Sequence, residues 1–445
     1  MAEQPLAPQF IDADEREAPP ARLVQPIQRG SGSEAAVARP AIKKRGFLAT
    51  IDTFVLIGVL MMLAIGTLMI YSTTFDWSYQ EFGVETAIVM QHVRNIAIGA
   101  VIMFVLAVID YRVWKRFAVL LLLLTIGSLI AVLLFSDQVF GARRSFLNGS
   151  YQPGELAELT IVIYLAAWMS SKKRGMASFF NGLLPFTVLI GLVGGLILLQ
   201  PDLSTAATIF ITAGLMYFLA GANLMHLGVV LGVMGGAGFL LSQRLSYAQG
   251  RVLTYIAGLT DLTQTNYHAQ QAIIAFLNGG WTGVGLGQGR QKFGFLPAPH
   301  TDSIFAVIGE ELGVLGAGFI VLLFVLVIVR GLQVARRCAN PFGALLAAGI
   351  TLWIATKALM NIAVMINLLP ATGVALPFIS FGGSSLVTAM AGAGILLSVS
   401  RVTAIANMPE GRSARADHDR GWGNRWSRVP GSSSRRSAAP TASRR

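Results

Sequence analysis

The sequence predicts an all-α integral membrane protein with ten transmembrane helices, a large extracellular loop and a re-entrant segment. Hydrophobic residues make up 54% of the 445 residues and charged residues only 13%, about half the charged share of an ordinary soluble domain. The apolar residues fall in long runs, each close to the ~20 residues that a helix needs to cross a bilayer. Basic residues gather in alternate loops between these runs.

The apolar runs predict the following spans, in chain order: 53–72, 94–110, 115–135, 155–171, 183–199, 203–220, 226–242, 304–329, 343–368 and 384–403. The first run begins near Thr53, too late for a cleavable signal peptide, so we expect this helix to remain as a membrane anchor. The count requires spans 183–199 and 203–220 to form a tight hairpin through residues 200–202.

The charges of the loops predict the orientation. With ten spans, the basic segments all fall on one side, which the positive-inside rule identifies as the cytoplasm; they are residues 43–45, 111–117, 171–182 and 330–337. Segment 73–92 contains no Lys or Arg, as expected outside, where we also place loops 136–154 and 243–303. The net charge of +12 is explained by this topology, and we expect no nucleic-acid partner.

Segment 369–383 is apolar but contains two prolines and three glycines, which prevent a regular helix. Irregular backbone at membrane depth is tolerated where it is buried in protein or lines a cavity. We therefore expect a re-entrant or cavity-lining segment, with a plain hairpin between helices as the alternative.

The composition divides the chain into three parts: a disordered cytoplasmic tail at 1–46, a membrane domain at 47–404 and a disordered basic cytoplasmic tail at 405–445. The last tail contains nine arginines against three acidic residues, and neither tail has enough apolar surface to fold. Trp422 and Trp426 stand among these arginines and could dock on anionic membrane lipids. The alternative is a solvated tail that only fixes topology.

Ionisable residues within membrane spans are costly and therefore suggest a functional site. Glu155 and Glu158 lie three residues apart on one face at the start of the fourth span, and Lys357 lies deep in the ninth. Glu310 and Glu311 lie in the eighth span. Asp302, just before that span, is either a helix cap beside Thr301 and Ser303 or part of a site.

Other kinds of site receive little support from the sequence. The histidines lie far apart and no metal-ligand spacing occurs, so no metal site is predicted. The single cysteine, Cys338, excludes a disulfide within the chain. The glycine-rich stretch 279–290 could cradle a phosphate through its N–H groups, although a flexible loop is the default reading.

Four stretches together resemble the SEDS family (shape, elongation, division and sporulation), which includes RodA and FtsW. They are GARRSFLNGSYQPGEL at 141–156, QPDLSTA at 200–206, GGWTGVGLGQGRQKFGFLPAPHTDSIFAVIGEELG at 279–313 and NLLPATGVALPFISFGGSS at 367–385. The resemblance covers roughly residues 53–404. It implies ten helices and both termini in the cytoplasm, in agreement with the charge pattern.

The resemblance also implies an activity, a partner and a location. The family polymerises lipid II into glycan strands at the outer face of the bacterial cytoplasmic membrane, beside a class B penicillin-binding protein. Its essential acid corresponds to Asp302, which we expect to act as general base on the acceptor hydroxyl. Arg143 and Arg144 are candidates for holding the pyrophosphate, with Arg290 and Lys292 as weaker ones.

Further residues, in the matching motifs or on the helices next to them, are expected around the substrate. They are Glu155, Glu158, His300, Thr301, Lys357, Ser384 and Ser385. The sequence predicts no cofactor, although a divalent cation on the substrate pyrophosphate is chemically plausible.

The sequence departs from the family pattern at three positions. Ser145 stands where a tryptophan is usual, and Glu158 stands where a lysine is expected. Lys357 stands where we expect a neutral amide. Lys357 could therefore replace the missing charge from the ninth helix. The hypothesis is that it pairs with Glu158 across the helix interface, with Glu310 or Glu311 as the alternative partners.

Two other functions remain open at this stage. Intramembrane charges and a broken segment also fit a lipid II flippase or transporter, although no inverted repeat is evident. A non-catalytic scaffold of the division or elongation machinery is the third reading, and the change to Glu158 favours it slightly. The long tails lean toward the FtsW side of the family.

Overall fold

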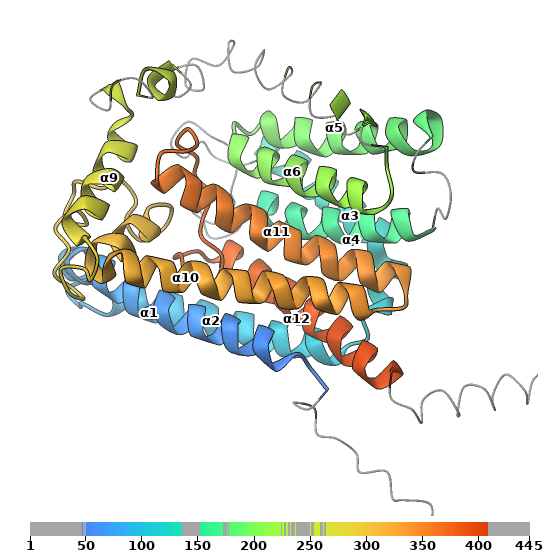
Figure 1. Ribbon diagram of the computed structural model, residues 1–445, viewed down its shortest axis with the longest axis horizontal. Coiled ribbons are helices and arrows are strands. Elements are labelled where there is room, and N and C mark those ends of the chain that lie inside the picture. The colour runs from blue at the N-terminus through green and yellow to red at the C-terminus, as the bar shows by residue number, and fades with distance from the viewer. Residues whose placement is uncertain are drawn as a thin grey trace, which may run out of the picture. The chain divides into compact units, whose positions relative to one another are not determined.

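The computed structural model describes residues 50–135, 152–171, 178–223, 253–258 and 264–407, with isolated positions between them. Regular structure in these residues is helical (Figure 1). The elements are α1 (Thr53–Phe82), α2 (Ala87–Val108), α3 (Arg112–Phe135), α4 (Pro153–Ser171), a π-helical turn (Phe179–Leu183), α5 (Leu184–Leu198), α6 (Leu203–Leu219), α9 (Tyr267–Gly279), α10 (Ile304–Arg337), α11 (Pro341–Met365) and α12 (Ser384–Ala406).

The helices confirm the predicted all-α membrane fold. Seven helical stretches among the described residues are long and apolar enough to cross a bilayer: α1, α2, α3, residues 179–198, α10, α11 and α12. Helix α6 is apolar but shorter, and α4 carries two carboxylates. The predicted span 226–242 lies mostly outside the described residues, as do the predicted tails, so the count of ten stays a prediction.

Helix α11 lies at the centre of the bundle and packs against α4, α6, α10 and α12 (Figure 1). Its membrane-length window is 78% buried. Small residues let neighbouring helices approach closely. A Cβ on Gly331 of α10 would lie 2.2 Å from Thr351 Oγ1 of α11, and one on Gly394 of α12 would lie 2.5 Å from Met103 O of α2. These glycines therefore set the helix spacing around the core.

The expected long loop at 73–92 is wrong, because α1 continues to Phe82 and α2 already begins at Ala87. The polar residues of this stretch lower its hydropathy without ending the helix. The Thr73 and Thr74 hydroxyls donate to the carbonyls of Met69 and Ile70, which keeps them within the helix. The turn comes at Gly83, where φ is +70°.

Helix α10 is interrupted at Gly313, whose φ of +70° and ψ of −172° are not helical. The break frees the carbonyls of Glu310 and Glu311, which accept hydrogen bonds from Val284 and Gly285 of the preceding loop. A Cβ on Gly283 would lie 2.2 Å from Glu311 O. The glycine-rich stretch is thus docked on α10.

Segment 369–383, called the buried segment below, is irregular, and its central part 374–380 is buried except at Ala375, as predicted for backbone enclosed by protein. Leu376, Phe378 and Ile379 are at most 1% exposed. A Cβ on Gly66, near the middle of α1, would lie 2.8 Å from Ile379 Cα. The segment therefore reaches deep into the bundle, and α11 ends before it, at Met365.

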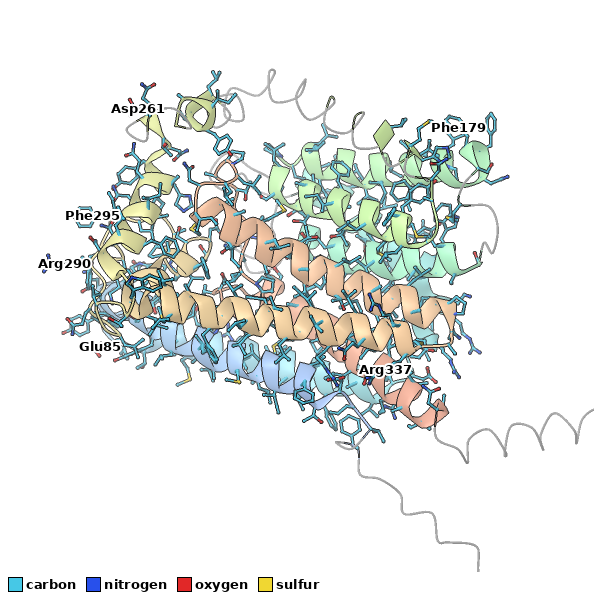
Figure 2. The ribbon with its side chains drawn as sticks, in the orientation of Figure 1. Glu85, Phe179, Asp261, Arg290, Phe295 and Arg337 are labelled. Carbon is cyan, nitrogen blue, oxygen red and sulfur yellow. The ribbon has the colours of Figure 1, made fainter. Side chains whose placement is uncertain are left out.

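An ion pair closes the opposite end of the bundle. Asp52 Oδ1 accepts the N–H groups of Phe54 and Val55 at the start of α1, and Arg330 Nη2 of α10 lies 2.7 Å from Asp52 Oδ2. Helix α10 continues past this pair to Arg337, far from Glu85 at the other end (Figure 2).

Candidate active site

Asp302 lies directly before α10, in a turn that also contains His300 and Thr301. Ser303 occupies the N-cap position of α10, and its side chain forms no capping hydrogen bond; instead its hydroxyl contacts His268 and the carbonyl of Pro297. Asp302 is therefore not at the cap position. Its carboxyl group lies in the surrounding site, next to Gly373 of the segment 369–383.

Three segments meet at the Asp302 carboxyl group. A Cβ on Gly373 would lie 3.2 Å from Asp302 Oδ2 and 4.0 Å from Ser204 Oγ. The absence of a side chain at Gly373 thus leaves room between the buried segment, the first turn of α6 and Asp302. That turn is fixed by Asp202, whose carboxylate accepts the N–H of Thr205.

A charged cluster buried between α4 and α11 lies at the same end of the bundle. Lys357 Nζ lies 2.9 Å from Glu158 Oε2 and 2.5 Å from Glu155 Oε2. Trp353 Nε1 donates a third hydrogen bond, of 2.8 Å, to Glu158 Oε2. The side chains of Lys357, Glu155 and Glu158 are 5%, 12% and 1% exposed. The predicted pairing of Glu158 with Lys357 is confirmed, and Glu155 completes the cluster.

One face of α11 connects this cluster to Asp302. Trp353, Lys357 and Asn361 are spaced by four residues and therefore lie on the same side of the helix. Asn361 Nδ2 donates to the carbonyls of Asp302 and Val374, both at 2.7 Å. A single helix face thus binds α4, the Asp302 turn and the buried segment.

Ser384 and Ser385 begin α12 beside the same cluster. The Gln152 N–H, immediately before α4, donates to Ser384 Oγ at 3.4 Å. Ser385 lines a narrow crevice together with Trp353, Lys357 and Pro377. Both serines are thus close to the charged cluster, and their predicted role in substrate binding stays a prediction.

His300 is enclosed by aromatic rings. Its ring centroid lies 5.0 Å from that of Trp77 and 5.8 Å from that of Phe381. Burial lowers the pKa of His300 from 6.5 to about 4, so its imidazole is neutral at pH 7. A neutral ring can pack between Trp77 and Phe381 without an ionic partner.

Glu310 and Glu311 hold the glycine-rich loop in place. Glu310 Oε1 accepts the N–H of Arg290 at 3.0 Å, and Glu311 Oε2 accepts that of Gly287 at 3.0 Å. Lys292 Nζ lies 2.7 Å from Glu311 Oε1, with both side chains at most 1% exposed. The loop's N–H groups thus bind carboxylates of this chain, which argues against the phosphate cradle and removes Lys292 as a candidate for pyrophosphate.

The remaining candidates for pyrophosphate binding are three arginines. Arg290 is exposed and points away from the helices (Figure 2). Arg143 and Arg144 lie outside the described residues. Within the part of the chain that the structure describes, no group of three or more His, Cys, Asp or Glu side chains could hold a metal ion.

Sequence reasoning missed Ser204, Gly373 and Asn361 as neighbours of Asp302. The first two lie within matching motifs, but no property of the residues themselves marks them. Asn361 carries a detectable signal, because an amide in an apolar helix needs hydrogen-bond partners.

The model of the FtsW/RodA/SpoVE family of cell cycle proteins matches residues 52–405. The chain belongs to this family. These are the SEDS proteins that the four sequence motifs resemble, and the matched region contains each of the described site residues.

Curated relatives cover the FtsW/RodA/SpoVE domain almost completely. Stage V sporulation protein E of Bacillus subtilis (strain 168) is 35% identical over 355 residues, which is 79% of this chain and 97% of that protein. The probable peptidoglycan glycosyltransferase FtsW of Geobacter metallireducens is 36% identical over 364 residues, which is 79% of this chain and 96% of that protein.

Solved structures of similar fold agree with the family assignment. A chain of a peptidoglycan synthase complex matches with a TM-score of 0.65 at 24% identity, over 79% of this chain and 98% of that one. The rod shape determining protein RodA of Thermus thermophilus matches with a TM-score of 0.59 at 24% identity, over 79% and 97%. At this identity both likenesses concern the fold.

Proposed function

We propose that this chain is a peptidoglycan glycosyltransferase that polymerises lipid II into glycan strands. The observation that carries the proposal is the position of Asp302, a partly exposed residue. Its carboxyl group lies where the start of α10, the buried segment and the first turn of α6 meet. Family membership and the name of the Geobacter metallireducens relative support it. The resemblance of the motif at 300–302 also implies that Asp302 stands at the position of the family's essential acid.

In the proposed reaction, the 4-hydroxyl of the acceptor sugar attacks the anomeric carbon of a lipid-linked donor. A C–O bond forms there while the bond to the pyrophosphate breaks, and Asp302 takes the hydroxyl proton as general base. The pyrophosphate leaves with its own negative charge, so no second acid is required. Arg143 and Arg144 are proposed to hold it, because guanidinium groups suit phosphate oxygens.

The residues around Asp302 are proposed to form the rest of the substrate site. Glu155, Ser384 and Ser385 supply polar groups near the α4–α11 cluster, and His300 and Thr301 flank the base. Glu158 and Lys357 are proposed to act mainly through each other, since both are buried and paired. A divalent cation on the substrate pyrophosphate is compatible with this proposal.

The membrane topology and the partner are part of the same proposal. The basic loops on one side support the proposal that both termini lie in the cytoplasm and that Asp302 lies at the outer face of the bacterial cytoplasmic membrane. The peptidoglycan synthase complex of similar fold coordinates polymerisation with crosslinking. We therefore propose a class B penicillin-binding protein as partner, in a division role of the FtsW kind.

The test uses the purified full-length chain with fluorescently labelled lipid II, first in detergent and then in vesicles. Products are separated on a gel, and lipid II movement across the vesicle bilayer is followed separately. Polymer formation is the expected result. Movement of lipid II without polymer would indicate a flippase. The absence of both activities, with and without the penicillin-binding protein, would indicate a scaffold.

A further inference from the structure

Three consecutive carbonyl oxygens, those of residues 300–302, each accept one hydrogen bond from the C-terminal third of the chain. The donors are, in order, the N–H of Phe381 at 2.8 Å, the hydroxyl of Ser380 at 2.6 Å and the Nδ2 of Asn361 at 2.7 Å. Two of the three donors are side chains. The Asp302 turn is therefore held along its whole length by groups remote in sequence.

Both side-chain donors are buried and also bind the segment beneath the turn. Ser380 is 4% exposed and its hydroxyl accepts the N–H of Leu376 at 2.8 Å. Asn361 is 1% exposed, and its second amide hydrogen binds the Val374 carbonyl. Each side chain thus joins the Asp302 turn to the buried segment that approaches the carboxyl group through Gly373.

The orientation of the Asn361 amide is determined by its partners. Both are carbonyl oxygens, which only accept, so the NH2 group must face them. Among the described residues, Asn361 Oδ1 then has no hydrogen-bond partner, an unfavourable state for a buried polar atom. The Asn361 side chain is therefore suited to binding these two carbonyls and does more than fill space between the helices.

A general base must stand within hydrogen-bond reach of the proton it removes. Small displacements of a reacting group lower the rate strongly. We call the three hydrogen bonds from Asn361, Ser380 and Phe381 the clamp. The clamp holds the Asp302 backbone in place, while the carboxyl group stays beside the space at Gly373. Loss of a clamp bond would therefore disturb the placement of the base more than the affinity for the substrate.

We propose that Ser380 and Asn361 are positioning residues for Asp302, an inference that rests on the proposed polymerase function. Removing the hydroxyl in Ser380→Ala should lower kcat by roughly tenfold or more, with KM changed less than about twofold. Ser380→Thr keeps a hydroxyl and should recover part of the kcat. Asn361→Leu, of similar volume, should show the same selective loss of kcat.

Ser398→Ala is the matched control. Ser398 is buried in α12, and its hydroxyl donates to the carbonyl of Ile109 at 2.5 Å, so this variant also loses one buried hydroxyl-to-carbonyl bond. It should lose less thermal stability than Ser380→Ala, which also leaves the Leu376 N–H without its acceptor, and it should keep its kcat.

Steady-state polymerisation and thermal unfolding of each purified variant give the decision. A selective fall of kcat in Ser380→Ala, with Ser398→Ala unaffected, supports the inference. Equal kcat values in the two serine variants would overturn it. A fall of kcat in Ser380→Ala that is no larger than the fraction of unfolded protein would also overturn it. If Ser380→Ala does not fold, Asn361→Leu decides by the same criteria. Failure of the polymerase proposal is distinguishable, because wild type itself would then form no polymer.

Discussion

Lys357 Nζ of α11 contacts Glu158 Oε2 of α4 at 2.9 Å, although 199 residues separate them in sequence. The two residues depart from the family pattern together, as a Glu in place of a lysine and a lysine in place of an amide. The contact agrees with the expectation that Lys357 supplies, from the facing helix, the positive charge that the family pattern has at position 158. The end of α11 at Met365 permits it, since Lys357 then lies only about 12 Å from that helix end.

Because Lys357 binds two carboxylates, we expect Lys357→Gln to be more destabilising than Glu158→Gln. The first variant strands both glutamates in the bundle, at a cost of ~3–5 kcal/mol typical of a broken buried pair. The second leaves Lys357 with Glu155. Lys357→Gln combined with Glu158→Gln should cost less than the sum of the single changes. Thermal unfolding of the four proteins in one detergent measures these terms.

Arg330→Gln provides a control for this cycle, since it breaks an ion pair at the other end whose arginine is 23% exposed. Partial exposure should make its cost smaller than that of Lys357→Gln. Strictly additive losses for Glu158 and Lys357 would mean that the contact contributes no coupling energy.

The sequence predicted the helical membrane fold, the irregular buried segment and the pairing of Glu158 with Lys357. These features follow from properties that hydropathy and charge report directly. The predicted boundaries of α1 and α2 were wrong. A hydroxyl group lowers the hydropathy of a stretch, but it can donate to a carbonyl of its own helix and therefore does not end the helix. Thr73 and Thr74 are the clearest examples.

Long-range packing explains what the sequence could not predict. Glu310 and Glu311 read as intramembrane charges of a site, yet they bind the glycine-rich loop through contacts 19 to 24 residues away. The clamp on Asp302 depends on where the buried segment turns, including Phe378, whose φ is +66°. No local pattern reports that turn.

Lys292→Met should lower the stability of the protein, whereas Arg290→Ala should leave it almost unchanged. Lys292→Met leaves the buried Glu311 carboxylate without its cation, so we expect a loss of ~3–5 kcal/mol and a lower unfolding temperature. Arg290→Ala removes only an exposed side chain and should change stability by less than about 0.5 kcal/mol. Unfolding temperatures of both variants test this, and equal values would show that the Lys292–Glu311 pair is not stabilising.

Arg143→Ala and Arg144→Ala should raise KM for lipid II more than they lower kcat, because the proposed role of these guanidinium groups is to bind pyrophosphate. Each variant is compared with wild type over a range of lipid II concentrations. An unchanged substrate dependence in both would remove the two arginines from the site.

His300 predicts an acid-sensitive contribution to stability. Its folded pKa of about 4 is below the ordinary 6.5, so the unfolded chain binds the proton more readily. The stabilisation is therefore complete above pH 6.5 and is lost as the pH falls from 6.5 toward 4, by at most about 3 kcal/mol. Unfolding at pH 7 and pH 5 should differ more for wild type than for His300→Gln. An equal difference would exclude this burial effect.

The polymerisation rate of Asp302→Asn tests the central claim most directly. The amide is nearly isosteric but cannot take the proton from the acceptor hydroxyl, so glycan polymer should disappear while membrane insertion and unfolding temperature stay unchanged. Asp76→Asn is the matched control, since Asp76 is exposed on α1 beside Trp77 and undergoes the same change of charge. It should polymerise like wild type. Near wild-type polymer from Asp302→Asn would contradict the assignment of Asp302 as the general base.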